Sequence, residues 1–351
     1  MKRIWNNWED LNFCRKDLTI NSMIFIRLLL LLMPLSVFTQ SNTNFILGMG
    51  SCLDQDNDQQ EIWASLEKEH LTEFFFLGDN IYGDKKDGSL EEMKSAYKKQ
   101  TNRLPNWLNQ IETNAIWDDH DYGVNDGGGD YKGKKEAQKL FLDFWGIKSP
   151  DRRAKGEGVY FSKNIILDNK TIKLIGLDTR YFRSSLEGDK RNRTPTKDIN
   201  KTVLGADQWS WLENQLAEDL DILILASSIQ IIATNHGFEK WGNFPHERER
   251  LLRLINKLNK PVVMLSGDRH KAGLYKIGNL YEITSSSLNR PLPKWLSTYW
   301  DATKKETDEF LVGEMFYEPN YGILEIQDKN NIKLELKNKK GETLNKLIIS
   351  Y

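Results

Sequence analysis

The stretch Leu77-Gly78-Asp79-Asn80-Ile81-Tyr82-Gly83-Asp84 indicates both the fold class and the place of a functional site. It ends an apolar run that predicts a buried strand, and Gly78 allows the tight turn that closes the strand. Asp79 therefore stands at the carboxyl end of a strand, where open α/β sheets place their ligands. With the oxygens of Tyr82 and Asp84 nearby, the stretch suits a hard cation. The alternative is a plain strand-end turn in which Asp79 caps a helix.

The segments around this stretch predict a β-α-β unit. Residues 44–50 form an apolar strand pattern, residues 61–70 repeat apolar side chains at helical spacing, and residues 73–77 form the next strand. This order implies parallel strands joined by a right-handed crossover. Cys52 and Asp79, which follow the two strands, are then expected at the same edge of one sheet.

The rest of the chain continues to mix strands and helices, which predicts the α/β class without an internal repeat. Further helices are expected over residues 90–100, 105–110, 134–145, 207–218, 247–258 and 293–300. Further strands are expected over residues 114–117, 158–161, 173–178, 221–232, 261–265, 280–286, 321–327, 332–337 and 345–350. No linker is long enough to divide residues 43–351, so we expect one domain there.

Because positive and negative residues nearly balance, the protein has no strong net electrostatic field. The 351 residues include 49 Lys plus Arg and 50 Asp plus Glu, so nothing in the net charge favours nucleic acid as a partner. Basic residues cluster between residues 180 and 193, and a solvated loop is the favoured reading for most of them. The sequence indicates no oligomeric state.

The amino-terminal region predicts a secretory signal peptide within residues 1–42. Met23-Ile-Phe-Ile-Arg27 leads into a short leucine-rich core and a small polar exit, and the apolar run is short for a membrane span. We expect translation to start at Met23 and the protein to be exported, to the periplasm or outside the cell. The alternative is a retained signal anchor, so that membrane contact would occur only through an uncleaved leader.

Cysteine use narrows the role of one residue. Cys14 would be removed with the leader, which leaves Cys52 as the one thiol of the mature chain. An exported protein with an unpaired cysteine calls for an explanation. Cys52 is either a buried, inert side chain or a thiolate that binds a metal ion.

Three strand exits share a metal-binding composition. They are Gly78-Asp79-x-x-Tyr82, Asp118-Asp119-His120-Asp121 and Gly267-Asp268-Arg269-His270, and Cys52 adds a fourth exit. So many carboxylates in one poorly solvated cleft would repel one another, and cations would remove that repulsion. Asp79 is best placed to bridge two ions ~3.5–4 Å apart, the arrangement used in phosphoester cleavage.

Six motifs in one order resemble a known family. They are Gly50-Ser51-Cys52, Gly78 to Asp84, Trp117 to Asp121, Asp178-Thr179-Arg180, Ser227-Ser228-x-Gln230 and Gly267 to His270. Together, over roughly residues 45–340, they resemble the alkaline phosphatase D (PhoD-like) family of calcineurin-like metallophosphatases. The resemblance implies a four-layer α/β/β/α metallophosphatase sandwich and a two-metal phosphoesterase.

The resemblance also implies a dinuclear centre of Fe(III) with Ca²⁺. Carried over by motif, the ferric ligands would be Cys52, Asp79, Tyr82 and His270, and the second site would use Asp79, Asp119 and Asp268. Thiolate and phenolate suit Fe(III), and carboxylates suit Ca²⁺. Asp118 is the alternative to Asp119.

Two features depart from the family pattern. Wider metallophosphatases have a histidine ligand after a middle strand. His236 is either this ligand or a loop histidine near the substrate. The best-known members also carry an amino-terminal β-domain, and here the first core strand follows the leader almost at once. We therefore expect that domain to be absent.

The expected reaction is hydrolysis of a phosphate ester, with phosphodiesters favoured and phosphomonoesters also cleaved. A metal-bound hydroxide would attack, and His120 would protonate the leaving alkoxide. Arg180 would bind the phosphoryl oxygens, or would instead pair with Asp178 or Asp121. Asp121 is expected to shape its turn.

The sequence gives less support to three other functions. An exported metal-containing binding protein without catalysis is the main alternative. A zinc hydrolase is disfavoured because no His-Glu-x-x-His motif occurs, and a serine esterase because no Gly-x-Ser-x-Gly motif occurs.

Overall fold

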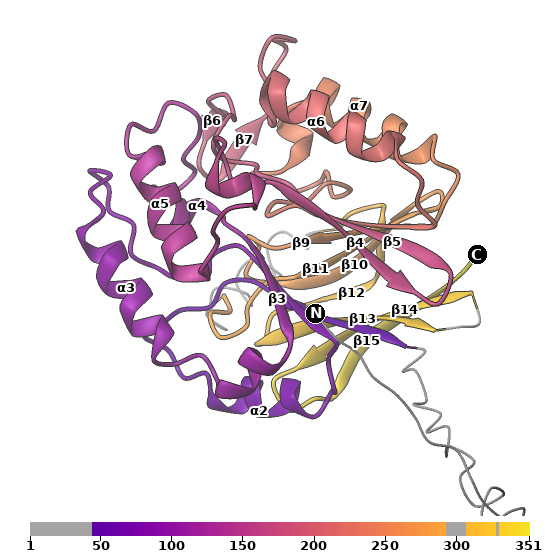
Figure 1. The fold of residues 1–351 in the computed structure, drawn as a ribbon. Helices are drawn as coiled ribbons and strands as arrows, with labels where there is room; N and C mark the ends of the chain where they lie inside the picture. Colours follow the sequence, from indigo (N-terminus) through magenta and orange to yellow (C-terminus); the bar gives the residue numbers. More distant parts are fainter. Residues whose placement is uncertain (1–43, 293–306, 328–329) are drawn as a thin grey trace, which may run out of the picture. The chain divides into compact units, whose positions relative to one another are not determined.

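Two large β-sheets carry the elements that surround the predicted site. The computed structural model describes residues 44–292, 307–327 and 330–351 (Figure 1). The leader expected within residues 1–42 and the helix expected over residues 293–300 lie outside these ranges. Within them, no helix combines the length and the apolar character needed to cross a bilayer.

The first sheet has six strands in the order β15-β14-β13-β1-β2-β3. Its strands are β1 (Phe45–Gly50), β2 (Glu73–Leu77), β3 (Glu112–Ile116), β13 (Asn320–Gln327), β14 (Asn331–Asn338) and β15 (Thr343–Ser350). The predicted β-α-β unit is confirmed, because β1 runs parallel to β2 and β2 runs parallel to β3. The carboxyl-terminal strands pair antiparallel, with β13 against β1.

The second sheet has seven strands in the order β12-β10-β11-β9-β8-β5-β4. Its strands are β4 (Phe161–Leu167), β5 (Lys170–Gly176), β8 (Ile222–Ala226), β9 (Val262–Ser266), β10 (Ala272–Ile277), β11 (Leu280–Ser285) and β12 (Leu311–Phe316). Strands β5, β8, β9 and β11 are parallel to their neighbours in this series, so their carboxyl ends meet at one edge.

Helices cover the outer face of each sheet. The α-helices are α2 (Gln60–Glu67), α3 (Glu91–Thr101), α4 (Asp119–Tyr122), α5 (Lys134–Trp145), α6 (Gly205–Ala217) and α7 (Pro245–Asn256). Short 3₁₀ helices occur as η1 (Asn106–Gln110), η2 (Arg152–Ala154) and η3 (Trp241–Asn243). Helices α6 and α7 lie over the second sheet in Figure 1, and α2 and α5 pack on the first. The predicted four-layer α/β/β/α sandwich is confirmed.

Strand β2 shows why this sequence forms the layers. Phe75 and Leu77 point into the core between the two sheets, whereas Phe74 and Phe76 point to the core beneath the helices. Side chains alternate between the two faces of a strand, and a sheet that is covered on both faces needs apolar residues at every position. The uninterrupted Phe-Phe-Phe-Leu run therefore belongs to a buried strand.

Several predicted boundaries are wrong. The strand expected over residues 158–161 begins only at Phe161, and the strand expected over 221–232 ends at Ala226. Residues 105–110, expected as a helix, form the short 3₁₀ helix η1. The basic segment between residues 180 and 193, expected as a solvated loop, leads into a hairpin of β6 (Glu187–Asp189) and β7 (Asn192–Thr194). Strands β10 and β12 were not expected.

Candidate metal centre

The predicted metal-binding side chains come together in three overlapping groups. Within each group, one candidate ligand atom per residue lies within 4.8 Å of the others. The groups are Cys52 with Asp79 and His270, Asp79 with Asp119 and His120, and Asp118 with Asp119 and Asp268. Asp79, which was predicted to bridge two ions, joins the first two groups, and Asp119 joins the last two.

Parallel strands explain this convergence. Cys52 follows β1, Asp79 follows β2, and Asp119 follows β3, all at the carboxyl ends of strands in the first sheet. Asp268 and His270 follow β9 in the second sheet. The two strand edges are tied together by a bridge between Ser51 and Ser286 and by a hydrogen bond of 3.1 Å from the Ser51 N–H to the carbonyl of Ser285.

The backbone at this edge is strained. Four candidate ligands have positive φ angles, at 56° for Cys52, 52° for Asp79, 66° for Asp268 and 52° for His270. Side chains with a Cβ disfavour this region by ~1–2 kcal/mol per residue. Such strain gathers at functional sites, where the surrounding structure maintains it.

Gly78 makes the close approach of β2 and β3 possible. Its φ is 103°, and a Cβ added there would lie 2.6 Å from the Cβ of Asp118. A larger residue would therefore push apart the two turns that carry Asp79 and Asp119.

Asp79 lies at the centre of the groups and is buried. Its Oδ2 accepts a hydrogen bond of 3.0 Å from the Tyr82 hydroxyl and lies 3.5 Å from the Cys52 sulfur. Burial raises the pKa of Asp79 well above its ordinary value, and the neighbouring acidic groups Cys52 and Asp119 raise it further. Bound cations would offset this cost, so the donor set of thiol, phenol, imidazole and carboxylates fits metal ions.

Asp121 shapes the turn, as predicted. Its carboxylate accepts hydrogen bonds from the backbone N–H groups of Asp79 (3.1 Å), Asn80 (3.3 Å) and Asp118 (2.6 Å). It does not belong to any of the three groups among the described residues. Asp121 therefore joins the β2 exit to the β3 exit and positions their acidic side chains.

His120 lies beside the centre and has a partner that its motif did not indicate. Its Nδ1 lies 2.5 Å from Oδ1 of Asp84, and its ring lies 4.3 Å from the Tyr82 ring. Burial would lower the pKa of His120, yet Asp119, Asp79 and Asp84 together raise it well above the ordinary value. Asp84, expected from its sequence position to add an oxygen near the cation, instead orients the His120 ring.

Arg180 has different partners from those expected. Its side chain is fully buried, with Nε 2.7 Å from Asp118 Oδ1 and Nη1 2.6 Å from Glu239 Oε2. Only its backbone N–H contacts Asp178, at 2.9 Å. Arg180 thus supports the acidic turn from behind and does not face the cleft. Glu239 was missed because its loop carries no recognisable motif.

His236 lies in the loop near the cleft. Its Nδ1 accepts a hydrogen bond of 3.2 Å from the N–H of Phe238, and its ring is buried. In the part of the chain that the structure describes, it belongs to none of the three candidate groups.

The candidate ligands open into a cleft of about 330 Å³. It is lined by Asp79, Asp119, His120, Asn125, Asp126, Lys190, Arg191, Phe238, Glu239, Asp268, Arg269, His270, Lys271 and Leu292. The lining combines acidic residues with the basic residues Lys190, Arg191, Arg269 and Lys271, which suits metal ions together with an anionic ligand.

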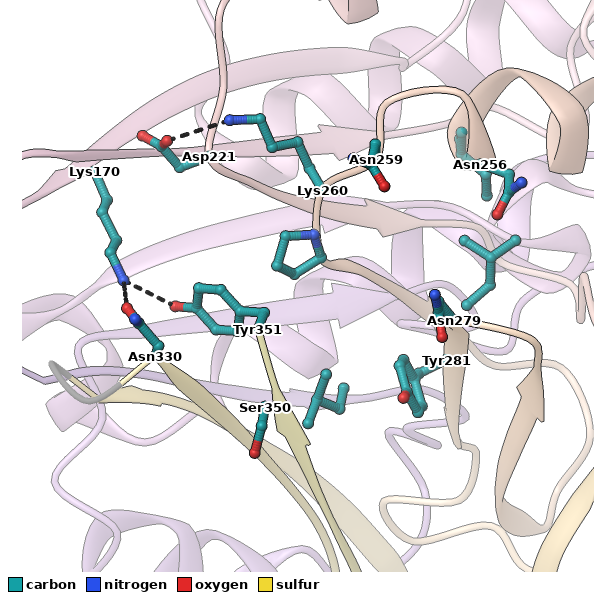
Figure 2. Close-up of a pocket in the computed structure, with 14 residues that line it drawn as sticks. Lys170, Asp221, Asn256, Asn259, Lys260, Asn279, Tyr281, Asn330, Ser350 and Tyr351 are labelled. Atoms are coloured by element: carbon teal, nitrogen blue, oxygen red, sulfur yellow. Dashed lines mark hydrogen bonds and ion pairs between the residues drawn. The ribbon is translucent and has the colours of Figure 1, made fainter.

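A larger cavity of about 570 Å³ lies at the other ends of the strands (Figure 2). Its lining includes Lys170 at the start of β5, and Asp221 and Pro261 just before β8 and β9. Asp221 is the one carboxylate side chain among its lining residues, and Lys260 pairs with it at 3.6 Å. This cavity therefore lacks the donor set of the metal centre.

Comparison with known proteins identifies the family and the fold. The model of the PhoD-like phosphatase family matches residues 106–343. Alkaline phosphatase D of Bacillus subtilis (strain 168) is 30% identical over 125 residues, which cover 32% of this chain and 21% of the relative. The match thus spans about a fifth of the curated relative's length.

Two solved structures share the fold. PhoD aligns with a TM-score of 0.64 and 18% identity, covering 88% of this chain and 68% of that one. The purple acid phosphatase PPD1 of yellow lupin (Lupinus luteus) aligns with a TM-score of 0.57 and 13% identity, covering 88% and 54%. At these identities the likeness concerns the fold, and the chemistry must be argued from the residues.

Proposed function

Because this chain belongs to the PhoD-like phosphatase family, we propose that it is a metal-dependent hydrolase that cleaves phosphodiesters and also phosphomonoesters. The observation that carries the proposal is that three overlapping groups of candidate ligands meet at the strand ends of the two sheets. Crowded carboxylates around a cleft are an arrangement that suits two cations acting on a phosphoryl group.

Two sets of residues would hold the ions. Cys52, Asp79, Tyr82 and His270 offer sulfur, phenol and imidazole ligands that suit Fe(III), and Asp79, Asp119 and Asp268 offer the oxygen ligands that suit Ca²⁺. When bound, the ions would supply an activated water and would stabilise charge on the phosphoryl oxygens.

The protein's own groups would do the rest. His120 would donate a proton to the leaving oxygen, and Asp84 would orient its ring through Nδ1. Arg180 would act as a positioning residue that keeps Asp118 and the neighbouring Asp119 in place.

We also propose that the protein is exported and that residues 43–351 form the mature enzyme. The support is the leader pattern after Met23. Mass spectrometry of the protein from intact cells would test this. A mature chain that begins near residue 43 is expected, and a chain that retains peptides from residues 5–20 would overturn it.

Assays of the purified protein test the activity. Protein prepared without chelators should contain two metal ions per chain and should hydrolyse bis-p-nitrophenyl phosphate and p-nitrophenyl phosphate. Metal content without turnover across a broad panel of esters would overturn the proposal and would favour a metal-containing binding protein.

A further inference from the structure

A small hairpin supplies two basic side chains to the cleft. Strands β6 and β7 are joined by a turn that contains Lys190 and Arg191, and both residues line the cleft together with Asp79 and Asp119. Both are exposed, and among the described residues neither side chain forms an ion pair. Two cations without counterions therefore face the candidate metal centre.

The hairpin pairs with Asp126, the residue whose backbone N–H also bonds the Asp119 side chain. Arg193 of β7 pairs with the carboxylate of Asp126, and the Asp126 N–H donates a hydrogen bond of 2.7 Å to Asp119 Oδ2. On its other side, the Arg193 N–H donates a bond of 2.7 Å to the carbonyl of Gly237. Arg193 thus anchors the hairpin at two points, which keeps the turn with Lys190 and Arg191 at the cleft.

Gly237 allows the turn of the hairpin to pack closely against the loop that contains Gly237. A Cβ added to Gly237 would lie 2.4 Å from the carbonyl oxygen of Arg191, which is closer than any real contact. The loop beneath the hairpin therefore needs a glycine at this position for Arg191 to stay where it is.

Other basic residues of the cleft already have contacts. The Arg269 guanidinium lies over the Phe238 ring at 4.7 Å, and the Lys271 ammonium lies over the Tyr317 ring at 4.8 Å. Lys190 and Arg191 differ because both are exposed and neither side chain forms an ion pair among the described residues. Since the protein supplies no counterion to them there, they suit an anionic group on the substrate.

We propose that Lys190 and Arg191 form an anion subsite that binds a second phosphate on the substrate. The inference rests on the proposed phosphoesterase function and names its substrate class, which is phosphodiesters that carry a further phosphate. Arginine and lysine bind phosphate through charge-assisted hydrogen bonds, and these two residues are not among those that would hold the metal ions.

A pair of matched substrates tests this subsite. Thymidine 5′-(p-nitrophenyl phosphate) and its 3′-phosphate derivative share the scissile bond and the leaving group and differ only by one remote phosphate. In the unaltered protein, kcat/KM should be higher for the derivative, mostly through a lower KM. A glycerol-based pair with the same difference shows whether the second phosphate alone or a nucleoside is recognised.

The variant Lys190→Ala/Arg191→Ala should reduce the ratio of kcat/KM between the two substrates by about tenfold, equivalent to ~1.4 kcal/mol. Lys197→Ala, at an exposed lysine of the same segment that does not line the cleft, is the matched control and should keep the ratio. Gly237→Ala should reduce the ratio in the same direction because it displaces Arg191. A ratio that is unchanged in the double variant would overturn the subsite.

A binding measurement separates the subsite from the activity. Thymidine 3′,5′-bisphosphate should bind the unaltered protein more tightly than the double variant in calorimetry, and added salt should reduce the difference. If neither substrate is hydrolysed but this difference is present, the proposed activity fails and the subsite stands. Equal binding by the two proteins would overturn the subsite even if hydrolysis is observed.

Discussion

Arg180 and Asp118 form an ion pair from which solvent is excluded. The Nη2 and Nε atoms of Arg180 lie 2.5 Å and 2.7 Å from Oδ1 of Asp118, and neither side chain is exposed. Glu239 bonds the same guanidinium at 2.6 Å and also pairs with Arg183 at 2.9 Å. This buried network adjoins the acidic turn of the metal centre, and its Glu239 also lines the cleft.

Removing the arginine should destabilise the whole fold. Arg180→Gln leaves Asp118 without its counterion in a buried place, and such a break costs ~3–5 kcal/mol of unfolding free energy. Urea unfolding followed by circular dichroism measures it. Arg250→Gln, which breaks the exposed pair with Glu213, is the control and should cost under ~1 kcal/mol. Equal losses in the two variants would contradict the role assigned to the network.

Asp79→Asn should remove metal ions and turnover while the fold persists. Asparagine has the size of aspartate and tolerates the positive φ of this position, but it lacks the charge that would bridge two cations. Metal analysis and bis-p-nitrophenyl phosphate assays should both fall to background, with an unchanged circular dichroism spectrum. Asp58→Asn, at an exposed loop carboxylate, is the control. Retained turnover in Asp79→Asn would refute the assignment.

Loss of the proton donor should depend on the leaving group. With His120→Gln, alkyl phosphodiesters should lose ~10²–10⁴-fold in kcat because their alkoxide needs a proton, whereas p-nitrophenolate leaves readily without one. Asp84→Asn should show the same pattern with a smaller loss, since Asp84 orients the ring through Nδ1. A loss of equal size for both leaving groups would show that His120 has another role.

Glu282 should make stability depend on pH. Burial raises its pKa in the folded state above 4.5, against the effect of N–H groups of Ile231 and Ile232 that bond the carboxylate. A carboxyl group whose pKa is raised by folding favours the folded state most when the pH lies below the ordinary pKa of the group. This contribution is lost as the pH rises through the pKa of the folded state. Unfolding free energies at about pH 5 and about pH 8 should show the protein losing stability relative to Glu282→Gln as pH rises. A constant difference between the two proteins would contradict this.

The candidate ligands were predictable because each follows a strand. A short apolar run that ends in Gly78-Asp79 or Gly267-Asp268 marks the carboxyl end of a parallel strand, and such ends share one edge. The predicted convergence of Cys52, Asp79, Asp119 and His270 therefore needed only the order of strands. Lys134–Trp145 was predicted to the residue for a similar reason, since its apolar spacing ends at Gly146.

The misses arose where tertiary contacts override local pattern. The isoleucines at 229, 231 and 232 made the strand pattern look longer than it is, because the N–H groups of Ile231 and Ile232 bond the Glu282 side chain and not a neighbouring strand. The Val159 N–H likewise bonds Asp178, which delays the start of β4. Arg180 could not be paired with Glu239 in advance because no spacing rule links residues of two loops.

The pairing of β1 has a consequence for how the protein is made. Its first edge meets β2, but its second edge meets β13, near the end of the chain. During translation, every candidate ligand leaves the ribosome before residues 320–327 exist, while β1 still has an open edge. A chain that stops before residue 320 would thus contain every candidate ligand yet lack the strand that pairs with the second edge of β1, so the site can be completed only after β13 has been made.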